Sequence, residues 1–161
     1  MTERILPINS EAEMLALGAK LATLLPNGGF LALDGNLGAG KTVLTRGLAA
    51  ALGIQRVQSP TFILSHEYDT KPPLFHLDVY RVRDENELYA IGYTDFLATP
   101  NALIVMEWAS LVPGALPVDR LNIHIHGGGD MPRIVTLRPC GEGYVELIRQ
   151  IENTHGNLIS S

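Results

Sequence analysis

The stretch "GNLGAGKT", residues 35–42, fits the pattern G-x-x-x-x-G-K-[ST] of a phosphate-binding loop. Small residues at 38–40 allow backbone N–H groups to approach anionic oxygens without a side-chain clash. Lys41 can reach the β and γ phosphates as a point charge, and Thr42 can offer its hydroxyl to Mg²⁺. The stretch therefore predicts a nucleoside triphosphate as ligand. The predicted contacts are Gly35, Asn36, Leu37, Gly38, Ala39, Gly40, Lys41, Thr42 and Val43.

The segments on either side of the loop have the order that such a loop requires. "GFLALDG" (29–35) is a short apolar run that ends at a glycine, which is typical of a buried strand. "KTVLTRGLAAALG" (41–53) repeats leucine at helical spacing, and Gly53 is a suitable C-terminal cap. The helix presents its positive N-terminal end to the same phosphates. Strand, loop and helix together predict an α/β fold of the P-loop NTPase type.

The remaining elements follow from periodicity and punctuation. A helix should begin after Ser10, whose S-x-x-E capping box includes Glu13, and end at Pro26. Further strands are expected at 4–8, 61–68, 74–81, 102–108, 120–126 and 133–139, and helices after Asp84 and over 141–153. They predict one domain, residues 1–152, with a flexible tail at 153–161. The sheet should be mixed, parallel around the loop and antiparallel towards one edge, with helices flanking it.

An acidic side chain is needed in addition to Thr42 to hold Mg²⁺. Glu107 directly follows the apolar run "ALIVM", which is the position of a Walker-B acid at the end of a buried strand. Glu107 is therefore one candidate for the acid that would hold the metal together with Thr42.

Asp78, within "LFHLDVY", is the other candidate acid. Period-2 alternation places His76, Asp78 and Tyr80 on one face of the strand and the apolar residues on the other. Asp78 could then polarise or position an attacking water. The alternative is that this face is simply the solvated side of a hairpin.

"SPTF" (59–62) lies between the loop helix and the first hairpin strand. Many phosphate-loop NTPases sense the γ-phosphate through a Ser or Thr of a mobile segment at this place in the chain, and Thr61 suits that role. The alternative, favoured by this segment alone, is a helix-to-strand turn. His124 and His126 form an i,i+2 pair that could bind zinc, but an exposed polar face is the better interpretation because further ligands are missing nearby.

The bulk composition limits the class of protein. The chain has 161 residues, of which 46% are hydrophobic and 18% charged, the balance of an ordinary globular domain. Its net charge of −5 lacks the electrostatic footprint of a nucleic-acid binder. The single cysteine, Cys140, forms no intramolecular disulfide. With neither a cationic-apolar leader nor an apolar run of about 18 residues, a cytoplasmic protein without membrane contact is expected.

The motifs of a GTPase, [NT]-K-x-D and D-x-x-G, do not occur in the chain, which favours ATP over GTP. A small-molecule kinase usually adds an arginine-rich lid over the phosphates. Here Arg81, Arg83 and scattered arginines offer only a sparse one, although Arg133 could approach a nucleotide. Two alternatives to an ATPase stay open. One is a phosphotransferase acting on a metabolite or protein, and the other is a nucleotide-gated binding module.

Five stretches in a fixed order resemble one family. "GNLGAGKT", "SPTF", "HLDVYR", "ELYAIGYTDFL" and "VMEW" look like the TsaE (YjeE) family of bacterial P-loop ATPases, over residues 8 to 140. The resemblance implies Mg²⁺-dependent, slow hydrolysis of ATP to ADP. It also implies action with the TsaD and TsaB proteins, which install threonylcarbamoyl on adenosine 37 of tRNAs that read codons beginning with A. The contact with tRNA would be only indirect.

The resemblance also assigns roles to single residues. Lys41 would hold phosphates, Thr61 would belong to a switch segment, and Asp78 would be an acid needed for hydrolysis, so these three are the predicted catalytic residues. Thr42 and Glu107 would lie in the magnesium shell, and Trp108 would neighbour Glu107. Ser10 and Arg133 are candidates for the nucleotide's adenine end. Asn36 stands where the family usually carries Asp or Glu, which removes a negative charge beside the loop.

Overall fold

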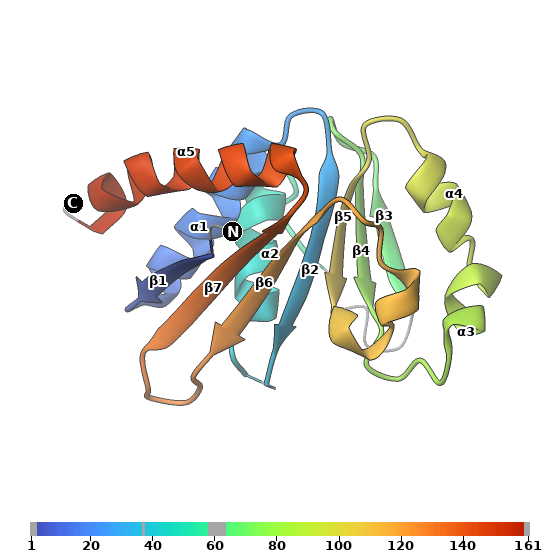
Figure 1. Ribbon diagram of the computed structural model, residues 1–161, viewed down its shortest axis with the longest axis horizontal. Coiled ribbons are helices and arrows are strands. Elements are labelled where there is room, and N and C mark those ends of the chain that lie inside the picture. Colours follow the sequence, from blue (N-terminus) through green and yellow to red (C-terminus); the bar gives the residue numbers. More distant parts are fainter. Residues whose placement is uncertain (1–2, 37, 58–63, 160–161) are drawn as a thin grey trace.

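One mixed sheet with helices on both faces makes up the protein (Figure 1). The computed structural model describes residues 3–36, 38–57 and 64–159, and of residues 152–159 the backbone alone. The described elements are β1 (Arg4–Ile8), α1 (Glu11–Leu24), β2 (Gly29–Gly35), α2 (Lys41–Ala51), β3 (Ser65–Tyr68), β4 (Leu74–Asp78), α3 (Glu85–Ala90), α4 (Tyr93–Ala98), β5 (Leu103–Glu107), the 3-10 helices η1 (Ala109–Leu111) and η2 (Pro113–Ala115), β6 (Arg120–His126), β7 (Arg133–Cys140) and α5 (Glu142–Ile159).

The seven strands lie in the order β1-β7-β6-β2-β5-β4-β3. The central strands β6, β2, β5 and β4 run parallel. Antiparallel pairs occur at both edges, β1–β7–β6 on one side and β3–β4 on the other, so the prediction of a single antiparallel edge is wrong. The reason is that two short connections each make a hairpin. Residues 69–73 join β3 to β4 at one edge of the sheet, and residues 127–132 join β6 to β7 towards the other edge. The α/β fold with a mixed sheet is confirmed.

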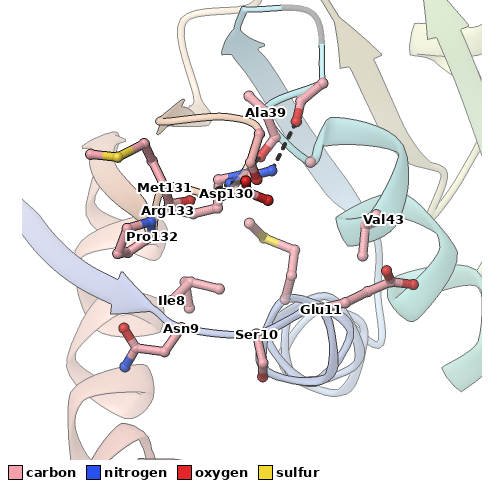
Figure 2. Close-up of a pocket in the computed structure, with 14 residues that line it drawn as sticks. Ile8, Asn9, Ser10, Glu11, Ala39, Val43, Asp130, Met131, Pro132 and Arg133 are labelled. Carbon is pink, nitrogen blue, oxygen red and sulfur yellow. Dashed lines mark hydrogen bonds between the residues drawn. The ribbon is translucent and has the colours of Figure 1, made fainter.

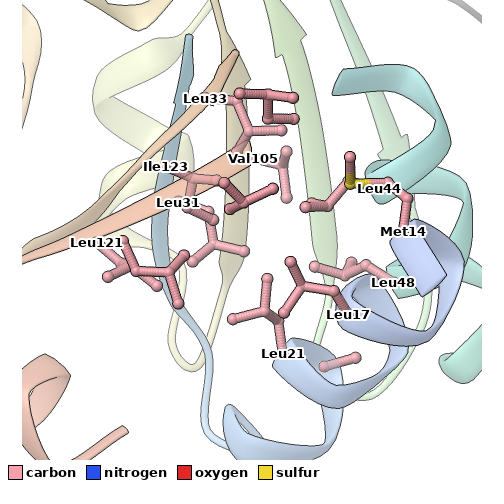
Figure 3. Packing of buried hydrophobic residues seen from close by; sticks show 14 of the residues in the cluster. Met14, Leu17, Leu21, Leu31, Leu33, Leu44, Leu48, Val105, Leu121 and Ile123 are labelled. Carbon is pink, nitrogen blue, oxygen red and sulfur yellow. The ribbon is translucent and has the colours of Figure 1, made fainter. Parts of the chain in front are cut away.

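Alternating side chains of the central strands fill two cores. Leu31 and Leu33 of β2 point towards α1, α2 and α5, and Phe30 and Ala32 point towards α3, α4 and the 3-10 helices. Figure 3 shows the first core, where leucines of α1 and α2 meet those of β2 and β6. Burial on both faces explains why the strands at 29–35 and 102–108 are continuous apolar runs in the sequence.

Helices α1 and α2 approach each other closely because glycines lie at their crossing. A Cβ on Gly18 would lie 2.1 Å from the carbonyl oxygen of Leu44, and a Cβ on Gly47 would lie 2.1 Å from that of Leu15. Each helix thus lacks a side chain where the other's backbone passes. This contact fixes α2, which begins at the glycine-rich loop, against α1.

Most predicted boundaries are confirmed, with corrections. The side chain of Ser10 accepts from the amide of Glu13 at 3.1 Å, while Glu13 reaches back to the amide of Asn9 at 2.7 Å rather than to that of Ser10. Strand β1 contains Pro7, which an edge strand tolerates because one side needs no ladder donor. Strand β4 ends at Asp78, not at residue 81, because the chain turns there.

Of the short elements after β4, α3 was expected after Asp84, and three others were missed by periodicity. Helix α4 and both 3-10 helices span six residues or fewer, too few for a repeat to be recognised. Helix α5 continues through residue 152 to Ile159, so its backbone is helical in the stretch predicted as a tail. The domain division at 152 stays a prediction.

Candidate functional site

The glycine-rich loop lies at the carboxyl end of β2 and leads into α2. Gly38 and Gly40 have φ of 78° and 119°, and Gly40 is the N-cap of α2. This left-handed region favours glycine, so the loop's shape depends on these residues. A Cβ on Gly38 would meet no atom within 4 Å, which means that open space faces the loop there. Leu37, also a predicted contact, lies outside the described residues.

Lys41, the first residue of α2, turns back over the loop. Its Nζ donates to the carbonyl oxygens of Gly35 at 2.5 Å and Asn36 at 3.0 Å. The same atom lies 4.0 Å from the centre of the Trp108 ring, within the range of a cation–π contact. Burial lowers the pKa of Lys41, against the opposing effect of the carboxylates of Glu107, Asp78 and Asp34. The buried Lys41 ammonium is therefore already held at the glycine-rich loop, where a phosphate would bind.

The two predicted acids stand side by side at the same edge of the sheet. Strands β4 and β5 are parallel neighbours, and their register pairs Asp78 with Glu107. The pair lies beside the loop because β5 also neighbours β2, with Leu33 opposite Glu107. Carboxyl ends of adjacent parallel strands are the usual place for a ligand site in an open α/β sheet.

Glu107 is nearly buried and has a buried partner. The residue is 4% exposed, and its Oε2 lies 2.5 Å from Nε2 of His76, which is not exposed at all. The alternative that His76 and Asp78 line the solvated face of a hairpin is therefore wrong. That face of β4 turns towards the core that α2 covers, where Leu74 is buried.

Asp78 is half-buried and accepts a hydrogen bond from the amide of Tyr80 at 2.9 Å. Burial raises its pKa, and the neighbouring Glu107 raises it further, whereas the Tyr80 amide, His76 and Lys41 lower it. Tyr80 itself lies in the turn after β4, half-exposed, with its ring 4.6 Å from that of Trp108. The prediction that it continues the strand face of Asp78 is wrong because the strand has already ended.

A hollow of about 460 Å³ joins these groups on one side of the loop. It brings together the predicted residues Lys41, Thr42, Asp78 and Glu107. Its full lining is Gly38, Gly40, Lys41, Thr42, Val43, Asp78, Tyr80, Arg81, Glu107 and Trp108. Thr61, the third predicted catalytic residue, lies with the whole "SPTF" stretch outside the described residues.

A second hollow, of about 310 Å³, lies on the other side of the loop (Figure 2). Ser10 and Glu11 at the start of α1 form one wall, and residues 129–132 of the β6–β7 connection form another with Arg133 of β7. Ala39 and Val43 belong to the lining, so the hollow is continuous with the glycine-rich loop. Ser10 and Arg133, both predicted to lie near the nucleotide, line this same hollow.

Arg133 spans from this hollow to the loop. Its Nε donates to the carbonyl oxygen of Ala39 at 2.8 Å and its Nη2 to that of Gly38 at 3.2 Å. Within its own turn, Nη1 donates to the carbonyl of Gly129 at 3.3 Å. Arg133 therefore braces the loop as well as lining the hollow. Sequence reasoning placed it near a nucleotide but gave no sign of these backbone contacts.

Two further features of the site were missed. Trp108 packs against the second core and, in addition, carries a left-handed φ of 63° and faces the ammonium of Lys41. The pairing of His76 with Glu107 was also not foreseen. The signal in the sequence was that His76 shares a strand face with Asp78, whereas the adjacency of β4 and β5 is known only from the fold.

The histidine pair lies on β6, the strand next to β2, with His124 opposite Asp34. His124 and His126 are exposed on β6, as predicted, and their rings stack at 4.1 Å. Burial and then the neighbouring His126 lower the pKa of His124. Over residues 3–36, 38–57 and 64–159, no group of three or more His, Cys, Asp or Glu side chains is placed to hold a metal.

Comparison with known proteins identifies the family. The family model described as "Threonylcarbamoyl adenosine biosynthesis protein TsaE" matches residues 8–135. The chain belongs to the TsaE family. A TsaE protein of Bacillus subtilis, named for tRNA threonylcarbamoyladenosine biosynthesis, is 40% identical over 94% of each chain. One from Streptomyces coelicolor is 38% identical over 80% of this chain and 92% of its own.

A solved structure agrees with the fold. The crystal structure of Bacillus subtilis YdiB superposes with a TM-score of 0.80 and 32% sequence identity, covering 96% of this chain and 97% of the other. The predicted P-loop type of α/β domain is thereby confirmed. Among the described parts of this TsaE-family chain, no helix has the length and apolar character to cross a membrane.

Proposed function

We propose that this protein is a Mg²⁺-dependent ATPase that acts with the TsaD and TsaB proteins in threonylcarbamoylation of adenosine 37 of tRNA. The observation that carries the proposal is the meeting of Lys41, Thr42, Asp78 and Glu107 in one hollow at the carboxyl ends of β2, β5 and β4. Family membership supplies the process, since the relatives are named for tRNA threonylcarbamoyladenosine biosynthesis.

The donor set suits the proposed cofactors. Thr42 and Glu107 offer a hydroxyl and a carboxylate, which are hard oxygen ligands of the kind that Mg²⁺ takes. Backbone N–H groups are available for phosphate oxygens at the start of α2 and in the loop before it, where Gly38 and Gly40 have positive φ. The hollow beside Ser10 and Arg133 would take the base and sugar. Mg²⁺, when bound, would neutralise charge on the β and γ phosphate oxygens.

The chain's own groups would act as follows. The Lys41 ammonium would leave the carbonyl oxygens of Gly35 and Asn36 for the phosphates, where it stabilises charge during in-line attack by water. Asp78 already uses Oδ1 for the amide of Tyr80, which leaves Oδ2 to accept a hydrogen bond from the attacking water. Water adds to the γ-phosphorus as the bond to the ADP oxygen breaks, giving ADP and phosphate. Thr61 would report the γ-phosphate to the partners.

A direct test is threonylcarbamoylation reconstituted from purified TsaD, TsaB, tRNA and substrates, with and without this protein. We expect multiple turnovers only when it is present, and loss of turnover with Lys41→Ala. Lys71→Ala is the matched control, because Lys71 is exposed on the β3–β4 turn. Equal multi-turnover modification without the protein would refute the proposal.

The fate of labelled γ-phosphate separates this proposal from a kinase. Release as free phosphate is expected, and label transferred to a metabolite or protein would make the chain a phosphotransferase. A variant that binds ATP without hydrolysing it, yet sustains many turnovers of modification, would instead make it a nucleotide-gated binding module.

A further inference from the structure

We propose that His76 is a positioning residue that holds the Glu107 carboxylate in place for the metal ion. The inference rests on the proposed function for the identity of Glu107 as a metal ligand. It concerns a different residue, and its first observations do not depend on hydrolysis.

The contact between His76 and Glu107 is short and buried. Nε2 of His76 lies 2.5 Å from Oε2 of Glu107, with the histidine wholly buried and the glutamate 4% exposed. The register of the parallel pair explains how they meet. His76 lies opposite Val105 and Asp78 opposite Glu107, so His76 and Glu107 are diagonal neighbours on one face of β4 and β5.

The direction of the hydrogen bond follows from its partners. As a metal ligand Glu107 would be ionised, and an ionised carboxylate only accepts, so the proposal places the proton on Nε2 of His76, which donates it to Oε2. Oε1 then has no bond to His76 and can serve as the oxygen that faces the cation. A histidine bonded to a ligating carboxylate in this way fixes the orientation of that carboxylate.

The other ring nitrogen argues against a merely space-filling role. Nδ1 of His76 is buried and has no hydrogen-bond partner among the residues that the structure describes. With the proton on Nε2, Nδ1 is a bare acceptor, and burying such a group without a partner is costly. Neighbouring Leu74 fills the same core face without that cost. What the histidine adds over leucine is the donor that Glu107 receives.

The experiment compares His76→Gln, His76→Asn and His76→Leu. Gln can place an amide N–H near the position of Nε2, Asn is too short to reach Glu107, and Leu has no donor. His66→Leu is the matched control: His66 lies opposite His76 in the β3–β4 pair, with its ring facing Tyr68 at 6.4 Å. Mn²⁺ affinity is measured by electron paramagnetic resonance with a non-hydrolysable ATP analogue, and analogue affinity alone is measured in chelator.

His76→Leu and His76→Asn should weaken Mn²⁺ binding by about 10–100-fold, the usual effect of losing a group that supports a metal ligand. His76→Gln should stay within about threefold of the wild type, and His66→Leu should not change it. Analogue affinity in chelator should be unaffected throughout. Equal Mn²⁺ affinity in wild type and His76→Asn overturns the proposal, as does a His76→Gln variant as weak as His76→Asn. The Asn and Gln pair keeps the test decisive if His76→Leu does not fold.

A second readout needs neither metal nor activity. Isotope-edited NMR of the imidazole should place the proton on Nε2 and show that its resonance shifts in Glu107→Ala. A proton on Nδ1 alone overturns the proposal. Failure of the proposed function looks different: the wild type would bind Mn²⁺ and nucleotide and show the Nε2 proton, yet release no phosphate.

Discussion

Arg133 of strand β7 donates from Nε to the carbonyl oxygen of Ala39 at 2.8 Å, a contact between residues 94 positions apart in the chain. Through it, the connection between β6 and β7 is tied to the glycine-rich loop. The hollow that would receive the base and the loop that would receive the phosphates therefore share a wall (Figure 2).

Replacing Arg133 by Met should weaken nucleotide binding. Loss of its charge-assisted bonds to the carbonyl oxygens of Ala39 and Gly38 should cost about 1–2 kcal/mol of binding, or roughly 5–30-fold in Kd by calorimetry. Arg120→Met is the control, because Arg120 also donates to a carbonyl oxygen, that of Pro117, but borders a hollow away from the loop. An unchanged Kd for Arg133→Met would show that the loop keeps its shape without this brace.

Replacing Asp78 by Asn should abolish hydrolysis without unfolding the protein. The amide keeps an oxygen for the Tyr80 amide but no longer accepts as a carboxylate, so phosphate release should fall about 10²–10⁴-fold while ATP affinity changes little. Asp69→Asn, at an exposed position after β3, should behave as wild type. Wild-type hydrolysis by Asp78→Asn would remove Asp78 from the mechanism.

The same variant should be at least as stable as the wild type at neutral pH. Burial raises the pKa of Asp78, so the folded state binds the proton more tightly than the unfolded state. The ionised carboxylate therefore destabilises the fold above its folded pKa, and this penalty disappears below the ordinary value of 3.8. Thermal unfolding at pH 7 without nucleotide checks this, and a clearly lower Tm for Asp78→Asn would contradict it.

Adding a methyl group at the crossing of α1 and α2 should destabilise the fold. In Gly47→Ala the new Cβ would lie 2.1 Å from the carbonyl oxygen of Leu15, so the helices must separate. We expect a loss of about 1–3 kcal/mol or more in the free energy of unfolding, measured by urea denaturation. Gly143→Ala in α5, where the Cβ meets nothing within 4 Å, should be neutral or slightly stabilising.

His124 should contribute to loss of stability in mild acid. Its pKa lies below the ordinary 6.5 because of burial and then His126, with smaller lowering effects from Lys41 and Arg138, whereas Asp34 opposes the shift. As pH falls from 6.5 towards the folded pKa, the unfolded state takes up the proton first, so stability drops. His124→Gln should lose less stability than the wild type over that window and match its pH dependence above it. If the free energy of unfolding has the same pH dependence in His124→Gln and in the wild type over the whole range, the prediction is contradicted.

The parts of the site that sequence could predict are those with local signals. Loop, β2 and α2 are contiguous, and Glu107 follows an apolar run, so pattern alone located them. The contact of His76 with Glu107 depends on β4 lying beside β5 in parallel register, which no segment of either strand encodes alone. Arg133 was placed near a nucleotide by resemblance, but its carbonyl partners depend on where a hairpin folds. Gly18 and Gly47 look like weak points of two helices until the helices are seen to cross there.

Trp108 is the single tryptophan of the chain, and the centre of its ring lies 4.0 Å from the ammonium of Lys41. Indole emission responds to a charge placed against the ring. A phosphate that draws Lys41 away from Trp108 would therefore change the intrinsic fluorescence of the protein without any label. The molecule thus carries its own optical reporter at the point where its proposed ligand arrives, and the kinetics of arrival can be followed in the unmodified chain.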